Sequence, residues 1–426
     1  MSHNKNEKMI AMLVDLLSSS LVVILYIFNS KLLCSSSFLA FSIIFFSIWI
    51  SYKLRKNNLL LLIFSIIAVI NISAAYTDIF RGGLSVAIWQ IPLRMTNYAM
   101  DTAKSLLLFL VILNICFNIN IIRKFLEKVS FTMDRKENIL LSIGCSILLI
   151  AIIVFGYDSS SAGEYVSNSN VMIEYSGLVF LMGFYYSKNL KYYDYFSVFY
   201  VFLFLYNSLI RGDRSAASII LILYVILYFP RLLKIGKIVI LSLIAILGSN
   251  FIGIVRDLSS VDDSILSDFF SKGLYIDTVS YAYYTSITFS AFYRIVGNSV
   301  YYLKQFIISI FIGTSKSDFA SFSKYIRDYD SFFFNRDGGF LSSWFFSWGG
   351  NLSVVLFTIL FGIIIILIFR MKNDYCKILS ISIAAYSLRW YLYNPINFFR
   401  VNLLILSLLY ILFYLVHRIM NRDGQD

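Results

Sequence analysis

The chain has 426 residues, of which 59% are hydrophobic and 14% are charged, and its mean hydropathy is +0.77. This composition excludes a water-soluble globular protein and predicts a polytopic membrane protein. The net charge of +12 would suggest a nucleic-acid partner in a soluble protein. Here the cations lie mostly in short segments between apolar runs, so we interpret them as a topology signal and expect membrane lipids, not nucleic acid, around the chain.

Twelve apolar segments are long enough to be transmembrane helices when the chain is read in windows of about 19 residues. They lie near residues 10–28, 33–51, 58–76, 100–118, 138–156, 171–187, 194–210, 215–230, 236–254, 345–369, 377–393 and 400–417. The first segment contains Asp15 and is followed by no small-residue cleavage pattern, so we expect it to be retained as a helix. We therefore predict an all-α protein with about twelve spans in a single transmembrane domain, residues 1–426.

Basic residues occupy every second connection between these segments, which predicts that both termini are cytoplasmic. Twenty of the 36 basic residues fall in the segments assigned to the inner face. These residues are Lys5, Lys8, Lys53, Arg55, Lys56, Arg123, Lys124, Lys128, Arg135, Lys136, Lys188, Lys191, Arg231, Lys234, Lys237, Arg370, Lys372, Lys377, Arg418 and Arg422.

Two connections on the predicted outer face are longer than the others. Residues 77–99 form a loop of medium length, and residues 255–344 form a large loop. The large loop has no proline and is rich in tyrosine and phenylalanine, a composition that folds and does not remain a solvated linker. Its apolar run at residues 306–313 is too short to cross a bilayer, so we expect short interfacial or re-entrant helices packed against the bundle.

The outer face is expected to carry arginine more often than lysine. A guanidinium presents a planar fork of donors that binds phosphate at two points and stays charged when partly buried. Arg389 lies within the apolar stretch "AAYSLRWYLYN", where an ionisable group is costly and is functional by default. The alternative to a functional role is that such arginines reach lipid headgroups or pair with nearby aspartates. The arginines assigned to this face are Arg81, Arg94, Arg211, Arg214, Arg256, Arg294, Arg327, Arg336, Arg389 and Arg400.

Cysteine and histidine give no sign of a metal or disulfide framework. The four cysteines lie in or beside different predicted helices, and both histidines, His3 and His417, are assigned to the inner face. We therefore expect no metal, no cofactor and no histidine base on the outside.

Three stretches carry a resemblance to a known family. "NRDGGFLSSWFFSWGGNLSVVLFTILFG", residues 335–362, resembles the end of the large periplasmic loop and the following helix of Wzy-type O-antigen polymerases. "RGDRSAAS" resembles their short arginine-bearing hairpin, and "RWYLYNPINFFR" resembles their outward arginine pair. The layout of nearly the whole chain is similar, although the motifs are degenerate.

The resemblance implies a GT-C-like helical bundle in the bacterial plasma membrane. The implied activity is polymerisation of undecaprenyl-pyrophosphate-linked oligosaccharide repeat units into O-antigen or capsular polysaccharide by a metal-independent glycosyltransferase. Arg211, Arg214, Arg256, Arg389 and Arg400 would bind the pyrophosphate. At the end of the large loop, Arg336 would face the sugar and Asp337 would be a candidate base, with Asp257 as another. A chain-length regulator protein is an implied partner of such an enzyme.

Three other functions fit part of the pattern. An O-antigen ligase would share the fold and chemistry, but the loop histidine of the ligases is absent here. A lipid-linked oligosaccharide flippase would be a transporter, with paired halves and more helices. A receptor or interaction protein with an external sensor loop is the third, but the large loop is too apolar for a freestanding soluble domain.

Overall fold

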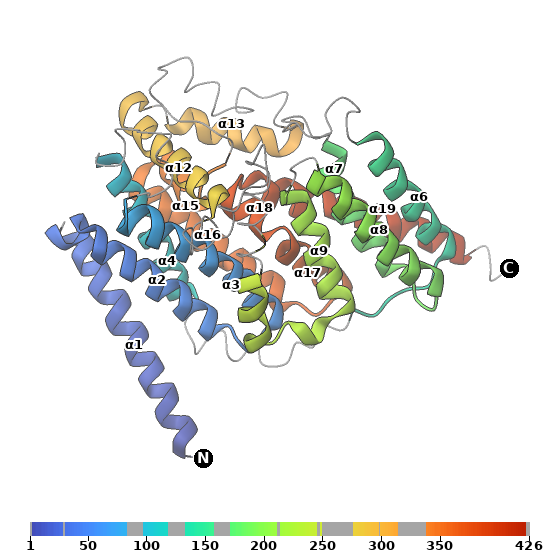
Figure 1. Cartoon of the computed structure of the whole chain (residues 1–426), viewed down its shortest axis with the longest axis horizontal. Helices are drawn as coiled ribbons and strands as arrows, with labels where there is room; N and C mark the ends of the chain where they lie inside the picture. Colours follow the sequence, from blue (N-terminus) through green and yellow to red (C-terminus); the bar gives the residue numbers. More distant parts are fainter. Residues whose placement is uncertain are drawn as a thin grey trace, which may run out of the picture. The chain divides into compact units, whose positions relative to one another are not determined.

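The computed structural model of the chain is helical in almost all the residues that it describes (Figure 1). These are residues 2–28, 30–82, 97–117, 133–156, 171–210, 214–244, 248, 276–297, 299–313 and 338–422. Their only β pairing is the isolated bridge between Glu137 and Ser187. The contacts divide the chain into two compact units. Unit 1 contains Met1–Lys128, Lys234–Leu367 and Trp390–Pro395, and unit 2 contains Val129–Leu233, Ile368–Arg389 and Ile396–Asp426.

Unit 1 begins with four helices that alternate in direction. They are α1 (Ser2–Ile27), α2 (Ser36–Lys53), α3 (Asn58–Ser73) with its π-helical continuation η2 (Ala74–Phe80), and α4 (Asn97–Cys116). At one end, the Tyr26 hydroxyl donates to the carbonyl of Lys104. At the other end, Lys53 Nζ lies 3.0 Å from the carbonyl of Asn114. This alternation agrees with the predicted order of the first four segments.

The described part of the large loop is helical and packs against these helices, as the composition predicted. It contains α12 (Asp277–Val296), α13 (Ser299–Ile312) and the start of α15 (Leu341–Ser347). Helix α12 contacts η2, α4 and α15. Buried hydroxyls lie between the helices: Thr102 Oγ1 is 2.8 Å from Ser290 Oγ, and Ser280 Oγ donates to Asp78 Oδ2 at 2.9 Å.

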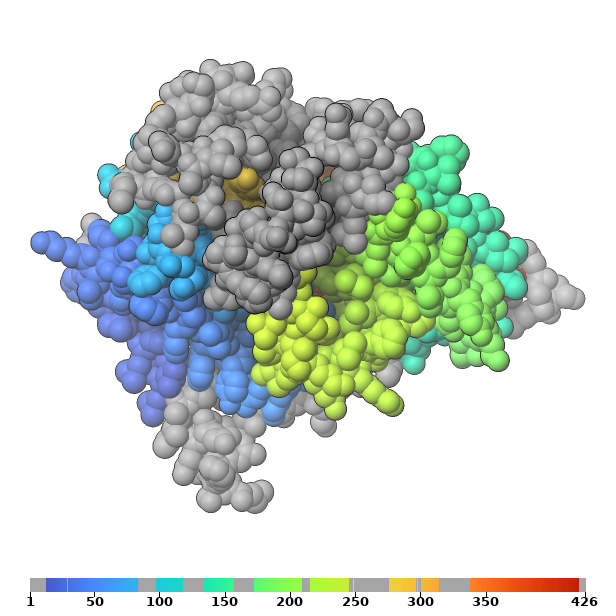
Figure 2. Space-filling model, viewed as in Figure 1, coloured from blue at the N-terminus to red at the C-terminus, as the bar shows by residue number. Residues whose placement is uncertain are grey.

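Unit 2 contains two helical hairpins followed by the C-terminal helices. The hairpins are α6 (Ile139–Phe155) with α7 (Val171–Tyr185) and α8 (Lys191–Ile210) with α9 (Arg214–Tyr228). The C-terminal elements are α17 (Asp374–Ala385), the π-helical η7 (Asn397–Ile405) and α19 (Leu406–Arg422). Of α18 (Ser387–Leu392), the residues up to Arg389 belong to unit 2 and those from Trp390 belong to unit 1. Helix α8, green in Figure 2, exposes Tyr195, Phe199 and Phe202 at 77%, 58% and 73%, as a helix facing lipid does.

The basic residues of unit 2 identify one of its two ends. Tyr185, which ends α7, donates to Asp374 Oδ2 at the start of α17 at 3.0 Å. Near the start of α6 and the end of α19, Asn138 Nδ2 lies 3.1 Å from His417 Nδ1. Tyr228, which ends α9, donates to Ser197 near the start of α8 at 2.9 Å. We call this the basic end of unit 2; the residues that define it are Arg135, Lys136, Lys188, Lys191, Arg231, Lys377 and Arg418.

Each of the twelve predicted segments contains helix, and five helices are long and apolar enough to cross a membrane among the described residues. These five are Ser36–Lys53, Asn58–Phe80, Asn97–Cys116, Gly350–Arg370 and Asn397–Met420. The chain is therefore an all-helical membrane protein over its described part.

Three details of the sequence prediction were wrong. The segment predicted at 345–369 is broken, because α15 ends at Ser347 and α16 (Gly350–Arg370) starts at a glycine with φ of +65°. The segment predicted at 377–393 is two helices, with Tyr386 between α17 and α18. Lys53 is not a loop cation: it is the last residue of α2, and its side chain is only 2% exposed.

Candidate functional site

Two of the predicted site residues, Arg389 and Arg400, have side chains that the structure describes. Arg211, Arg256, Arg336 and Asp337 lie outside the described residues, as does Asp257. Arg214 is described only as the first residue of α9. The site can therefore be built around Arg389 and Arg400, which both belong to unit 2.

Arg389 pairs with a carboxylate that sequence reasoning did not single out. Its Nη1 lies 3.3 Å from Oε1 of Glu174, which stands in the first turn of α7. The side chain of Arg389 is 13% exposed and that of Glu174 is 31% exposed. Because a charge buried to this degree in apolar surroundings is costly without a counter-charge, the carboxylate stabilises the guanidinium here.

Arg400 binds the next residue of the same helix turn. It lies in η7, and its Nε donates to the hydroxyl of Tyr175 at 3.2 Å. Tyr386 donates to the main-chain carbonyl of Glu174 at 2.6 Å. Three side chains from the C-terminal part of the chain therefore meet two consecutive residues of α7. We call these five residues the arginine cluster: Glu174, Tyr175, Tyr386, Arg389 and Arg400.

Local sequence explains why these segments approach so closely. A Cβ added to Gly177 would lie 2.7 Å from the hydroxyl of Tyr386, so the glycine leaves the space that this tyrosine needs. The π-helical turns of η7 are held by buried polar side chains: Ser382 donates to Asn402 Oδ1 at 2.6 Å, and Asn402 Nδ2 donates to the carbonyl of Asn397 at 2.8 Å. Such π-helical turns often occur at functional sites.

The arginine cluster lies at the end of unit 2 opposite the basic end. Glu174 is at the start of α7, and the other end of that helix carries Tyr185. The start of α9 belongs to the same end as the cluster, because Gly177 faces Ile219 and α7 and α9 are both the second helices of their hairpins. Arg211 lies outside the described residues and the side chain of Arg214 is not described, so the arginine-bearing hairpin before α9 stays a prediction.

The arrangement is suited to holding an anion. Two guanidiniums and one carboxylate leave a net charge of +1 on the cluster, and guanidiniums prefer the planar oxygens of carboxylate and phosphate. No group of three or more His, Cys, Asp or Glu side chains that could hold a metal ion occurs among the described residues.

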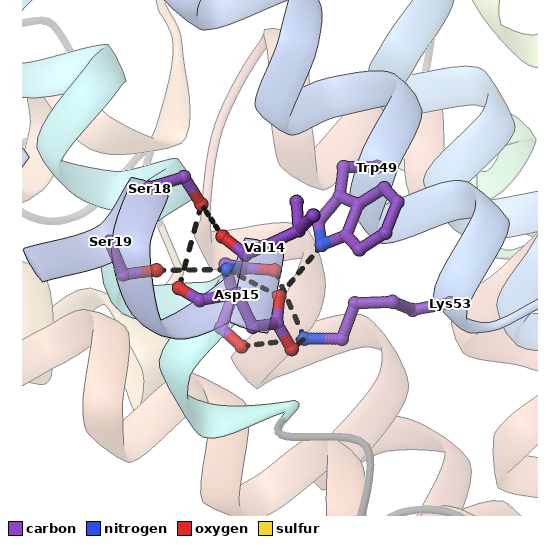
Figure 3. Close-up of polar contacts among 7 residues, drawn as sticks. Val14, Asp15, Ser18, Ser19, Trp49 and Lys53 are labelled. Atoms are coloured by element: carbon purple, nitrogen blue, oxygen red, sulfur yellow. Dashed lines mark hydrogen bonds and ion pairs between the residues drawn. The ribbon is translucent and has the colours of Figure 1, made fainter. Parts of the chain in front are cut away.

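Unit 1 holds a second buried charge cluster, which sequence reasoning also missed (Figure 3). Lys53 Nζ lies 2.7 Å from Asp15 Oδ2 and 3.0 Å from both the carbonyl and Oδ1 of Asn114. Asp15 Oδ1 accepts from Trp49 Nε1 at 2.7 Å and from Asn114 Nδ2 at 3.0 Å. Figure 3 shows the side chains of Asp15, Trp49 and Lys53 pointing toward one another.

This second cluster has a structural role, because its groups bind one another. All three donors of Lys53 are used, and one of them binds the carbonyl of Asn114 in the last turn of α4, where carbonyls lack partners within the helix. Lys53 therefore closes the end of α4, and Asp15 supplies the counter-charge from α1. No donor of the ammonium is left for a ligand.

The sequence contained only weak signals for these partners. Glu174 is an acidic residue in the first turn of an otherwise apolar helix, which the dipole of that helix alone would explain. Its position 215 residues before Arg389 cannot be paired by any local pattern. Asp15 was noticed within an apolar segment, which is the signal that could have led to Lys53.

The chain matches no known protein family, and no curated protein and no solved structure is significantly similar to it. The fold defines it as an all-helical membrane protein over its described part, in which Arg389 and Arg400 contact two consecutive residues of α7.

Proposed function

We propose that the protein polymerises lipid-pyrophosphate-linked oligosaccharide repeat units at the outer face of the bacterial plasma membrane. The observation that supports this proposal is the arginine cluster: two partly buried guanidiniums held on consecutive residues of α7, at the end of unit 2 opposite the basic end. If the basic end is cytoplasmic, as the positive-inside rule predicts, the cluster faces outward. The proposed architecture has twelve spans and two cytoplasmic termini.

The proposed reaction transfers the growing glycan from its lipid pyrophosphate to a hydroxyl group of the next repeat unit. The bond between the anomeric carbon of the growing chain and its pyrophosphate oxygen breaks, and its electron pair leaves with the lipid pyrophosphate. A hydroxyl oxygen of the next repeat unit forms the new glycosidic bond to that carbon and releases its proton. Arg389 and Arg400 would stabilise the charge that develops on the leaving group, each by about 3 to 4 kcal/mol if they act as single oxyanion donors do.

The remaining predicted residues complete this proposal. Arg211, Arg214 and Arg256 would add cations for the second phosphate, and Arg336 with Asp337 would approach the sugar from the large loop. A chain-length regulator is a proposed partner. A flippase or a ligase would use the same anionic substrate class, so the experiment must measure the length of the polysaccharide chains.

The test is Arg389→Ala in cells that make the polysaccharide. Single repeat units should accumulate on the carrier, and the ladder of longer chains should disappear. Arg135→Ala is the matched control, because Arg135 also pairs with a carboxylate, Asp194 at 3.2 Å, but at the basic end. A normal ladder in Arg389→Ala would defeat the proposal.

A further inference from the structure

We propose that Glu174 is an exchangeable counter-ion, which occupies Arg389 until the diphosphate of the substrate displaces it. This inference rests on the proposed function, since it names how the same site is regulated. It concerns described residues of unit 2 alone: Glu174, Tyr175, Tyr386, Arg389 and Arg400.

Arg389 needs an anion beside it even when no substrate is bound. Arg389 is 13% exposed and cannot lose its charge, because guanidinium stays protonated in proteins. Without an anion nearby, its burial would be strongly unfavourable. Glu174 provides that anion in the free protein, and a diphosphate would provide it in the complex.

The ion pair between Arg389 and Glu174 is loose enough for another anion to replace the carboxylate. Its N–O distance of 3.3 Å exceeds the about 2.7–2.9 Å of a tight charge-assisted hydrogen bond. The carboxylate is 31% exposed, so it is partly solvated already. A diphosphate brings more charge and more acceptor oxygens than one carboxylate, and it therefore competes well for the same fork.

The backbone of Glu174 is held independently of its side chain. Tyr386 binds the main-chain carbonyl of Glu174 at 2.6 Å, and Arg400 binds the neighbouring Tyr175 at 3.2 Å. Neither bond uses the carboxylate of Glu174. The side chain can rotate away from Arg389 toward solvent while the first turn of α7 keeps its place, so the exchange needs no helix movement.

A catalytic base is the competing role for the same carboxylate. Glu174 would then accept the proton of the attacking hydroxyl, and its loss would slow transfer without changing the affinity for the diphosphate. The counter-ion role predicts a higher affinity for the diphosphate when Glu174 is removed, because the competing negative charge is gone. The two roles therefore differ in a binding measurement made without any sugar substrate.

The experiment measures the Kd of inorganic pyrophosphate for the purified full-length protein in lipid nanodiscs. Glu174→Gln keeps the shape of the side chain and removes its charge. Its Kd should fall by up to about fivefold relative to wild type, the range expected from losing a partly exposed competing ion pair. Arg389→Ala should raise the Kd by at least about tenfold.

The matched control is Asp194→Asn, which removes the carboxylate that pairs with Arg135 at the basic end. Its Kd should equal that of wild type. Glu174→Asp provides the second variant if Glu174→Gln does not fold. Its shorter side chain keeps the charge but recedes from Arg389, so its Kd should also fall, by less than about fivefold.

The outcomes separate this inference from the proposed function. An unchanged or higher Kd in Glu174→Gln, together with a raised Kd in Arg389→Ala, would overturn the counter-ion role and leave the polymerase proposal standing. A lower Kd in Glu174→Gln with a normal polymer ladder in Arg389→Ala would support the exchange and defeat the polymerase. No pyrophosphate binding by wild type would overturn both.

Discussion

The hydroxyl of Tyr386 donates a hydrogen bond of 2.6 Å to the main-chain carbonyl of Glu174, 212 residues earlier in the chain. The bond fixes the first turn of α7 against the end of α17. It forms beside Gly177, the only residue type that leaves the tyrosine this space. The arginine cluster is thus built on a close helix approach as well as on charge.

Replacing Gly177 by alanine tests that approach. The new Cβ would lie 2.7 Å from the Tyr386 hydroxyl and 3.0 Å from Ile219, so either the Tyr386 side chain or α7 must shift. We expect a loss of about 1–3 kcal/mol of stability, the usual cost of overpacking, and a lower thermal midpoint in detergent. Gly144→Ala is the control, because Gly144 lies in α6 and a Cβ added there would have no neighbour within 4 Å. Equal midpoints for the two variants would contradict the close contact.

The sequence predicted the helices well because hydropathy is a local property. It missed the breaks at Gly350 and Tyr386, where the helices are interrupted although the chain stays apolar. It also missed which charges meet. Lys53 was interpreted as a loop cation because it stands next to Arg55 and Lys56, yet its side chain is buried against Asp15. Burial of that kind depends on how the helices pack.

The candidate site was predictable in part for the same reason. Arg389 stood out because it is an ionisable residue within apolar sequence. Glu174 did not, because an acidic residue at a helix start has a simpler explanation. The pairing of the two comes from tertiary structure and has no counterpart in local spacing.

Replacing Arg389 by lysine tests whether the guanidinium fork matters beyond its charge. Lysine keeps the positive charge but is a hydrated point charge that cannot bind two oxygens in one plane. We expect the yield of long polysaccharide to fall by at least about tenfold, measured as the ladder on a gel. Arg135→Lys, at the basic end, should leave the ladder unchanged. Full activity in Arg389→Lys would show that charge alone suffices.

Cysteine labelling from outside the cell tests which side of the membrane the predicted large loop and the basic end of unit 2 face. In a background without the four native cysteines, Asp330→Cys lies in the predicted outer loop and Lys188→Cys lies at the basic end. A membrane-impermeant maleimide should label position 330 in intact cells, and position 188 only after permeabilisation. Labelling of position 188 without permeabilisation would place the basic end outside and the arginine cluster inside the cell, away from an external substrate.

The cluster of Asp15, Lys53 and Asn114 gives a prediction about stability in unit 1. Asp15→Ala leaves the Lys53 ammonium buried without its counter-charge, with a side chain that is 2% exposed in the wild type. Breaking a buried pair in this way costs about 3–5 kcal/mol, whereas replacing both partners by apolar residues of similar volume is often nearly neutral. The thermal midpoint in detergent should therefore fall strongly in Asp15→Ala and Lys53→Met.

The double variant Asp15→Leu with Lys53→Met should recover part of this loss, because no unpaired charge is left in the helix bundle. Recovery should be incomplete, because Lys53 also binds the carbonyl of Asn114 at 3.0 Å and Asp15 accepts from Trp49 at 2.7 Å. The Asn114 carbonyl and the Trp49 indole N–H lose these partners in the double variant, and each unsatisfied buried polar group costs about 1–3 kcal/mol. If the two single losses simply added in the double variant, the two charges would not be coupled, and α1 would be held to α2 and α4 by packing instead.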